Sequence, residues 1–216
     1  MDASQNLTIE VVSDFVCPWC YVGKRRLDKA LSERPDLPVT VRWLPFQLSP
    51  DMPREGRNRL QHYQQIFGEQ RAATIISTMR DTGLEEGIEF GDDPQSMSPN
   101  TLSAHTLMYW AQQDGGVDTH DLAERLFAAH HVRCDDIGDL QVLAEIAATV
   151  GLSGAEVSTR LQAGEGEAEV AAQVQEAVGR GVTGVPFFVI NDRYGLSGAQ
   201  PVEALIATLE QITAAA

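Results

Sequence analysis

The sequence predicts an α/β protein in which both ends of the chain build one sheet and the middle forms a helical insertion. Two observations carry this prediction. The N-terminal part is patterned as strand, helix and strand, and the C-terminal part as helix, two strands and helix. Nearly everything between them has helical periodicity. We therefore predict a sheet-bearing domain made of residues 1–55 and 165–216, and an all-helical insertion made of residues 56–164.

The N-terminal elements follow from their residue patterns. Residues 7–14 (LTIEVVSD) are β-branched and partly alternating, which predicts a strand. Residues 18–33 have the spacing of an amphipathic helix. Residues 39–44 (VTVRWL) alternate strictly, which predicts a second strand, and Pro45 then ends regular structure. A strand–helix–strand unit indicates a parallel pair joined by a crossover helix.

The middle and the end of the chain are patterned differently. Helices are predicted in the insertion at residues 58–81, 100–113, 119–131, 137–150 and 155–162. Residues 91–100 are its clearest loop. Beyond it we expect a helix at 165–178, an apolar strand at 186–190, a return strand at 194–196 and a closing helix at 200–213. This order of elements is that of a thioredoxin-like fold with an inserted all-helical domain.

Composition narrows the classes of function. The 216 residues include 31 acidic and 16 basic side chains, for a formal net charge of −15. Such a chain repels nucleic acid and anionic membrane, so neither is expected as a partner. No apolar run approaches the roughly 18 residues that a membrane helix needs. Residues 1–5 lack the pattern of a signal peptide, which predicts a cytoplasmic protein.

The motif Cys17-Pro18-Trp19-Cys20 lies where the first strand ends and the first helix begins. Cys17 is therefore expected at the N-cap and Pro18 at the first helical position, where a missing N–H costs nothing. The free N–H groups and the positive dipole end of the helix favour a thiolate on Cys17. Cys20 lies one turn deeper, where it can attack a mixed disulfide.

Other uses of the cysteines were weighed against redox chemistry. A Cys-X-X-Cys pair can be half of a zinc site, but zinc needs about four ligands. No second such pair follows, although His130, His131 and Cys134 are close together in the sequence. Purely structural cysteines are a further alternative. The position at a strand-to-helix junction favours redox chemistry, so we expect no bound metal and a lone thiol at Cys134.

Gly184-Val185-Pro186 precedes the predicted apolar strand near the C-terminus. Proline cannot donate to a strand ladder, so it fits the start of a strand. In a thioredoxin-like fold this proline is cis and faces the cysteine pair. The backbone of Val185 is then expected to offer hydrogen-bonding groups to an extended substrate.

Two segments together resemble the FrnE-like branch of the DsbA family, residues 13–24 (SDFVCPWCYVGK) and 181–188 (GVTGVPFF). Residues 46–48, 100–105 and 194–201 support the resemblance, which covers nearly the whole chain. It implies a thioredoxin fold with a helical insertion and the activity of a protein disulfide oxidoreductase.

The resemblance also implies roles for single residues. Asp14 is a candidate for proton transfer, although Val11 stands where thioredoxins carry a buried acid. His105 follows the family pattern Asn-Thr-x-x-Ala-His and is expected near the cleft. Trp19 replaces the histidine of the DsbA proteins themselves, which predicts a less oxidising cysteine pair. The residues expected to contact substrate are Pro18, Trp19, Val185, Pro186 and His105.

We expect a protein or a small-molecule thiol or disulfide as substrate, and a monomer or homodimer. No cofactor is expected beyond the Cys17–Cys20 disulfide, with glutathione as a candidate co-substrate. Two alternatives stay open. One is a glutathione-linked isomerase or transferase of the kappa-class or hydroxychromene carboxylate isomerase type, which usually carries serine at the position of Cys17. The other is a redox-inactive, chaperone-like binding module.

Overall fold

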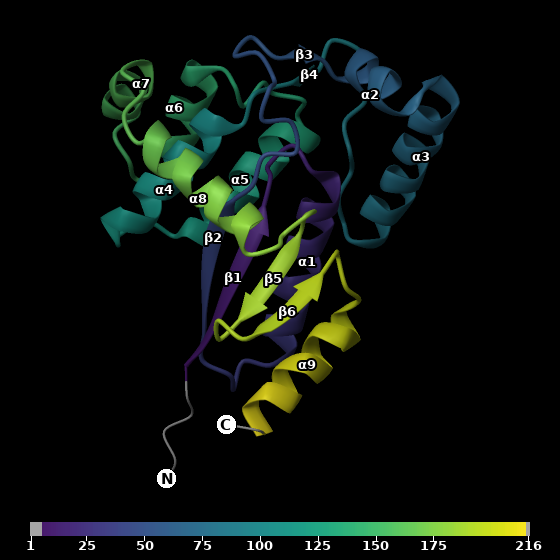
Figure 1. The fold of residues 1–216 in the computed structure, drawn as a ribbon, viewed down its shortest axis with the longest axis vertical. Helices are drawn as coiled ribbons and strands as arrows, with labels where there is room; N and C mark the ends of the chain where they lie inside the picture. The colour runs from purple at the N-terminus through teal and green to yellow at the C-terminus, as the bar shows by residue number, and fades with distance from the viewer. Residues whose placement is uncertain (1–5, 215–216) are drawn as a thin grey trace.

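The computed structural model describes residues 6–214. Residues 1–5, on which the prediction about a signal peptide rests, lie outside the described residues. A four-stranded sheet in the order β2-β1-β5-β6 forms its centre (Figure 1). β1 (Leu7–Ser13) pairs parallel with β2 (Val39–Pro45) and antiparallel with β5 (Phe187–Ile190). β6 (Tyr194–Ser197) pairs antiparallel with β5. The predicted α/β fold is confirmed, with its parallel pair and its C-terminal hairpin.

One face of the sheet packs against α1 (Pro18–Glu33) and α9 (Val202–Ala214). Val11 of β1 lies opposite Phe188 of β5, and both are almost fully buried. They share the main hydrophobic core with Leu27 of α1 and Leu205 of α9. Because successive strand residues point to opposite faces, this register sends alternate side chains towards these two helices.

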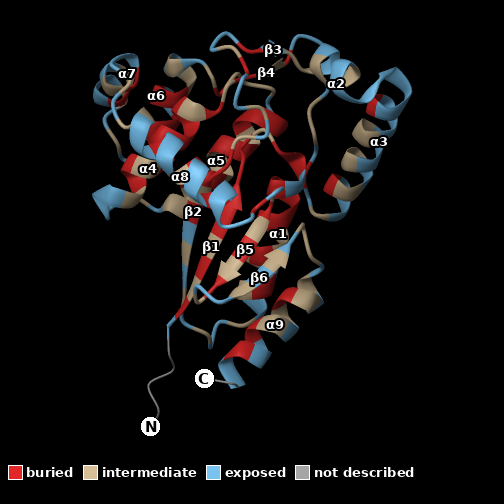
Figure 2. Ribbon diagram, viewed as in Figure 1, coloured by how far each residue is buried: buried red, intermediate tan, exposed pale blue. Residues whose placement is uncertain are grey.

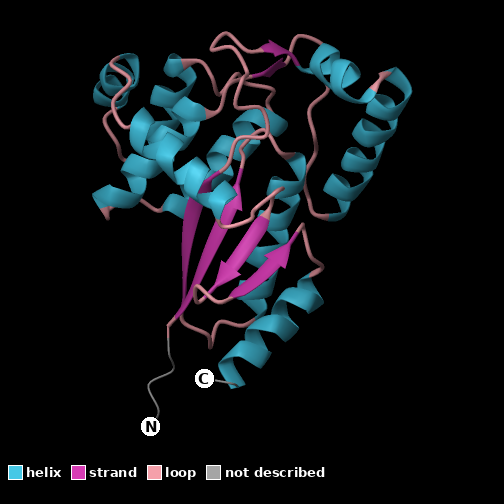
Figure 3. Ribbon diagram, viewed as in Figure 1, coloured by secondary structure: helices cyan, strands magenta, loops and turns pink. Residues whose placement is uncertain are grey.

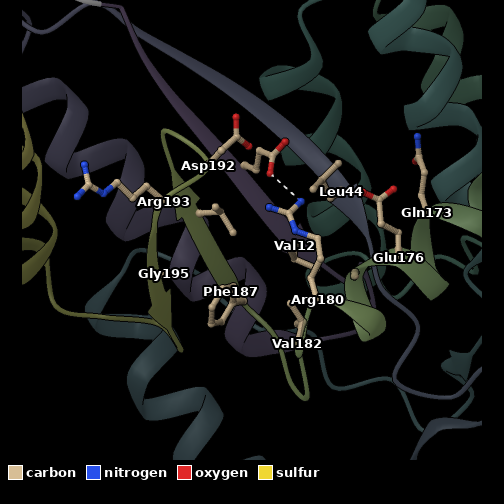
Figure 4. Close-up of a pocket in the computed structure, with 13 residues that line it drawn as sticks. Val12, Leu44, Gln173, Glu176, Arg180, Val182, Phe187, Asp192, Arg193 and Gly195 are labelled. Atoms are coloured by element: carbon tan, nitrogen blue, oxygen red, sulfur yellow. Dashed lines mark hydrogen bonds and ion pairs between the residues drawn. The ribbon is translucent and has the colours of Figure 1, made fainter.

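The other face of the sheet meets α8 (Glu167–Gly179) and is only partly covered. Val12 and Phe187, which pair across β1 and β5, pack in a small cluster with residues at and after the end of α8. Beside this cluster a cavity of about 350 Å³ opens towards β6 (Figure 4). An ion pair joins Arg180 Nη1 to Glu10 Oε2 there at 3.4 Å. The cysteines do not line this cavity.

The chain between β2 and α8 is mainly helical. It contains β3 (Arg57–Asn58), α2 (Arg59–Phe67), α3 (Glu69–Glu85), β4 (Met97–Ser98), α4 (Leu102–Asp114), α5 (Thr119–His131), α6 (Leu140–Thr149) and α7 (Gly154–Gln162). Buried side chains of α4 to α7 join the core of the sheet in one continuous cluster. α2 has no buried residue, and α3 has only Ala72 and Gly83 (Figure 2). The division into domains stays a prediction.

Two expectations about the insertion are wrong. The helix predicted over residues 58–81 is two helices, because Gly68 adopts φ 78° and ψ 156°, which no helix contains. The loop predicted over residues 91–100 contains β4, which pairs with β3 apart from the main sheet (Figure 3). Strands of two residues are too short to leave an alternating pattern. Within residues 6–214, no helix has both the length and the apolar character to cross a membrane.

Candidate active site

The cysteine motif lies at the junction of β1 and α1. Cys17 is the N-cap of α1, with extended backbone angles of φ −86° and ψ 113°, and Pro18 is the first helical residue. The Cys17 N–H donates to the Asp14 carbonyl at 3.0 Å, which makes the tight turn out of the strand. The Cys20 N–H donates to the Cys17 carbonyl at 3.1 Å. The motif therefore has the placement that the sequence predicts.

The two thiols are free, buried and adjacent. Cys17 is 4% exposed and Cys20 is 1% exposed, and the two lie about 3.4 Å apart without a bond. Burial raises the pKa of Cys20 well above its ordinary value, and the neighbouring Cys17 raises it further. Hydrogen bonds from the Ser13 side chain and the Asp14 backbone act in the opposite direction. Cys20 is thus held as a neutral thiol beside the outer cysteine.

The loop before β5 lies against this dithiol. The Val185–Pro186 peptide bond is cis, the conformation expected from the sequence. The Cys17 thiol donates to the Val185 carbonyl with Sγ and O 3.7 Å apart. A Cβ built on Gly23 would lie 3.0 Å from Pro186 Cγ, so a side chain at this position of α1 would press on the loop. Gly23 is not among the site residues that the sequence predicts.

Asp14 and His105 come together beneath the motif, and both are buried. Asp14 Oδ2 accepts from the Leu48 N–H at 2.8 Å. His105 Nε2 lies 3.0 Å from the Phe46 carbonyl and 3.4 Å from Asp14 Oδ1. A carbonyl only accepts, so Nε2 carries the proton that it donates. The structure therefore joins two candidates that are 91 positions apart in the chain through one buried polar contact.

The remaining predicted residues divide between the rim and the interior. Pro18 is buried, whereas the Trp19 side chain, at 36% exposed, lies at the surface beside the motif. Cys134 follows α5, and its sulfur accepts from Arg59 Nη2 at 3.7 Å. Among residues 6–214, no three His, Cys, Asp or Glu side chains are grouped to hold a metal ion. The expectation of no bound metal stays a prediction.

Two residues close to the dithiol were missed in the sequence. The Ser13 side chain lies close enough to Cys20 to lower the pKa of its thiol. Tyr63 of α2 is partly exposed, but desolvation, with a contribution from Cys17, raises its pKa to about 12, so this side chain lies within electrostatic reach of the motif. Ser13 does belong to the segment that resembles the DsbA family. Tyr63 has no comparable signal, because only tertiary packing brings it within reach of the motif.

Two features together define a protein with the thioredoxin fold. A pair of thiols lies at the start of the first helix, beside a sheet with parallel and antiparallel pairs. The loop that contains the cis-proline contacts the first of these thiols. The DSBA-like thioredoxin domain family matches residues 8–210. The chain belongs to this family, as the resemblance implied, and the family is one of thiol–disulfide oxidoreductases.

Solved structures with the same fold carry different activities. Probable DsbA oxidoreductase SCO1869 from Streptomyces coelicolor has a TM-score of 0.86 and 30% identity, over 95% of this chain and 89% of that one. Cytosolic disulfide reductase DsbM from Pseudomonas aeruginosa has a TM-score of 0.65 and 21% identity, over 97% and 100%. A 2-hydroxychromene-2-carboxylate isomerase has a TM-score of 0.70 and 14% identity, over 95% of each. The last two show the fold alone.

Proposed function

We propose that this chain is a thiol–disulfide oxidoreductase that exchanges disulfides through the Cys-Pro-Trp-Cys motif. One observation carries the proposal. Cys17 caps the N-terminus of α1 with Cys20 about 3.4 Å away, and its sulfur contacts the Val185 carbonyl of the facing loop. The helix N-terminus stabilises a thiolate, and the second thiol is within reach to complete the exchange. The assignment to the FrnE-like branch belongs to the same proposal.

The proposed reaction moves two electrons. The Cys17 thiolate attacks one sulfur of a substrate disulfide, which breaks the S–S bond, forms a mixed disulfide and releases one substrate thiolate. Cys20 loses its proton and attacks the Cys17 sulfur, which releases the second substrate thiol. The substrate is reduced to two thiols while Cys17 and Cys20 are oxidised to a disulfide. Run in reverse, the same steps oxidise a dithiol substrate.

The resolving step needs a group that accepts the Cys20 proton, because this thiol has a raised pKa. We propose Asp14 for this role. Its Oδ1 is buried and has no hydrogen-bond partner among the described residues, and His105 Nε2 lies 3.4 Å from it. His105 is then a positioning residue that holds the carboxylate beside the motif.

The substrate is proposed to bind between the motif and the loop of Val185 and Pro186. The Val185 carbonyl already accepts from Cys17, so this backbone can pair with an extended segment whose sulfur reaches the thiol. The exposed Trp19 is proposed to form the rim, and the buried Pro18 is proposed to shape the cleft from beneath it. A protein or a small-molecule thiol or disulfide fits this surface. Glutathione is a candidate co-substrate, and DsbM, which shares the fold, has been crystallised with it. The cytoplasmic location and the monomer or homodimer remain part of the proposal.

The isomerase or transferase alternative makes a different demand on the motif. It uses bound glutathione and needs no second cysteine, and the isomerase structure shows that this fold can serve it. The buried Cys20, placed to resolve a mixed disulfide, favours exchange instead. A chaperone-like module would need neither thiol. Activity that depends on both cysteines separates the three functions.

The test is the reduction of a disulfide-linked model peptide by the reduced protein, with single-cysteine variants. Cys17→Ser should abolish reduction, and Cys20→Ser should accumulate a mixed disulfide that mass spectrometry locates at Cys17. Cys134→Ser is the matched control and should react at the wild-type rate. Full activity in Cys17→Ser, or a mixed disulfide located at Cys134, would overturn the proposal.

A further inference from the structure

Residues 54–71, which include α2, differ in charge from the chain as a whole. They contain four of the 16 basic side chains and only two of the 31 acidic ones, Glu55 and Glu69. This segment therefore has a net charge of +2 in a chain whose net charge is −15. Its surface should attract acidic groups, which the rest of the chain repels.

Most arginines of this segment have no acidic partner. Eleven of the 16 basic side chains lie within ion-pair distance of a carboxylate. In the part of the chain that the structure describes, the others form no such pair: Arg42, Arg57, Arg59, Arg71 and Arg193. Three of these five belong to residues 54–71. Arg57 and Arg71 are also exposed, so their charges are available to another molecule.

The carboxylates beside this segment have partners of their own. Asp92 pairs with Arg80. Asp93 accepts from the Gln95 N–H at 2.8 Å. Glu69 lies in the first turn of α3, where the helix dipole favours an anion. These groups therefore do not replace an acidic partner for Arg57 or Arg71.

The same segment exposes apolar side chains. α2 has no buried residue (Figure 2), and Leu60, Ile66 and Phe67 are 43%, 53% and 38% exposed. The Arg71 guanidinium lies over the Phe67 ring, 5.9 Å from its centroid. Exposed aromatic side chains and arginines are enriched where proteins bind other proteins. A polypeptide with apolar side chains can cover this surface, whereas a small polar solute cannot.

The loop after β2 connects α2 to the approach of the cysteine motif. The Leu48 N–H donates to Asp14 Oδ2 at 2.8 Å. Ser49 Oγ, one residue further on, lies 3.5 Å from His62 Nε2 of α2. Leu48 itself is 47% exposed, so the apolar surface continues from α2 towards the motif. An extended polypeptide advances about 3.3 Å per residue, so residues close to a cysteine bound at the motif can reach α2.

We propose that residues 54–71 dock an acidic polypeptide that brings its disulfide to the motif. Carboxylates of the polypeptide pair with Arg57 and Arg71, and its apolar side chains pack on Ile66 and Phe67. The inference rests on the proposed disulfide exchange and names its substrate class, a polypeptide disulfide flanked by acidic and apolar residues. The net charge of the chain alone predicts the opposite preference, for a basic polypeptide.

Two disulfide-linked model peptides provide the test. They are identical, with leucine at the same positions, except that the cysteine is flanked by glutamate in one and by lysine in the other. The rate constant for reduction by the reduced full-length protein is divided by that for dithiothreitol, which corrects for the intrinsic reactivity of each disulfide. At low ionic strength the glutamate peptide should be reduced at least about threefold faster. The preference should vanish in about 1 M salt, where the Debye length is about 3 Å.

Variants at exposed positions locate the surface. Arg57→Gln/Arg71→Gln should abolish the preference for the glutamate peptide. Arg42→Gln/Arg193→Gln removes the same charge at exposed positions outside the segment, and as the matched control should keep the preference.

A second pair of variants tests the apolar contact. Ile66→Ser should slow the reduction of both peptides. Val178→Ser, at an apolar position of α8 that is 49% exposed, is the control and should not slow either.

A binding measurement separates docking from exchange. Labelled peptides with serine in place of cysteine are titrated with the protein, and Kd is obtained from fluorescence anisotropy. The glutamate peptide should bind at least about threefold more tightly than the lysine peptide to the wild-type protein, and equally to Arg57→Gln/Arg71→Gln. If neither disulfide peptide is reduced, the proposed exchange fails, and this binding preference still decides whether the surface docks acidic polypeptides. Equal or tighter binding of the lysine peptide, or an unchanged preference in Arg57→Gln/Arg71→Gln, would overturn the inference.

Discussion

Cys20 is the more deeply buried of the two motif thiols and the harder to ionise. Burial and the adjacent Cys17 raise its pKa, and the Ser13 and Asp14 hydrogen bonds offset only part of this rise. Cys17 instead caps a helix N-terminus, where N–H groups and the dipole favour the anion. The two cysteines of one motif are thereby suited to different steps, attack and resolution.

We predict that Cys17 is alkylated before Cys20 in the reduced protein at neutral pH. Only the thiolate reacts, and a raised pKa lowers the thiolate fraction at neutral pH, so Cys20 should react more slowly than a free cysteine peptide. A short iodoacetamide pulse followed by peptide mass spectrometry measures both rates, in a Cys134→Ser background. Faster labelling of Cys20 would contradict this division of roles.

His130 and His131 make the stability depend on pH. Burial lowers the pKa of His130 to about 3 and that of His131 well below its ordinary value. In the unfolded chain both titrate near 6.5. Below that pH the unfolded state binds protons that the native state excludes, so the stabilisation present above pH 6.5 is lost as the pH falls.

The free energy of unfolding should therefore decrease from pH 6.5 towards pH 4.5, by up to about 1.4 kcal/mol per pH unit for each histidine. Urea denaturation at several pH values measures this slope. His130→Gln should remove the contribution of one histidine to the slope. His62→Gln, at a less buried position, is the control and should leave most of the slope unchanged. An equal slope in wild type and His130→Gln would show that His130 is charged in the folded protein.

Residue-level prediction from the sequence was uneven. Cys17, Cys20 and Pro186 belong to local motifs, and such motifs can be recognised in one sequence. Asp14 and His105 were found only through the family resemblance, and the sequence does not show that His105 Nε2 would lie 3.4 Å from the Asp14 carboxylate.

At the scale of elements, α1 is fixed to α5 by charged side chains, of which Lys24 is buried and Glu124 and Arg25 are partly exposed. Lys24, whose side chain is 3% exposed, lies with its Nζ 3.0 Å from Glu124 Oε2. Arg25 Nη2 lies 2.7 Å from Glu124 Oε1, and the Tyr21 hydroxyl donates to the same oxygen at 2.6 Å. One carboxylate of the insertion therefore holds three side chains of the helix that carries the cysteine motif.

Replacing the Glu124 carboxylate should lower the free energy of unfolding more than replacing an exposed carboxylate does. Glu124→Gln keeps the shape but leaves the buried Lys24 with Asp28 as its remaining acidic partner, so we expect a loss of about 1–3 kcal/mol in the free energy of unfolding. Glu210→Gln is the control, because its ion pair with Arg34 is exposed to solvent and should contribute much less to the free energy of unfolding. Equal losses in urea denaturation would contradict the anchoring role of Glu124.

The helices were predicted better than their boundaries. α1 and α5 match the predicted ranges, because each has a strong apolar period and a local start signal, Pro18 for α1 and the Asp118 N-cap for α5. The apolar pattern continues through Gly68, which is why one helix is predicted over residues 58–81. The backbone of Gly68 is not helical, so the structure has two helices there. Periodicity shows which side chains face the hydrophobic core. It cannot show the backbone angles of an individual residue such as Gly68.

At the scale of the whole molecule, the fold follows from the two ends of the chain. β1 lies at the centre of the sheet, between β2 from the N-terminal part and β5 from the C-terminal part. Nearly 170 residues separate the motif from the loop that it contacts, and this pairing brings them together. The order of elements predicted that meeting, but the position of Tyr63 within electrostatic reach of Cys17 depends on tertiary packing that no local pattern encodes.

The equilibrium of the Cys17–Cys20 pair with glutathione tests most directly whether this dithiol exchanges disulfides. The protein is equilibrated in buffers of graded glutathione poise, and the fraction of intramolecular disulfide is measured by alkylation and mass spectrometry. We predict reversible two-electron behaviour, with about 30 mV per tenfold change in the equilibrium constant and a potential more negative than the roughly −120 mV of DsbA. Failure to form the Cys17–Cys20 disulfide at any poise, or oxidation found only at Cys134, would contradict the assignment.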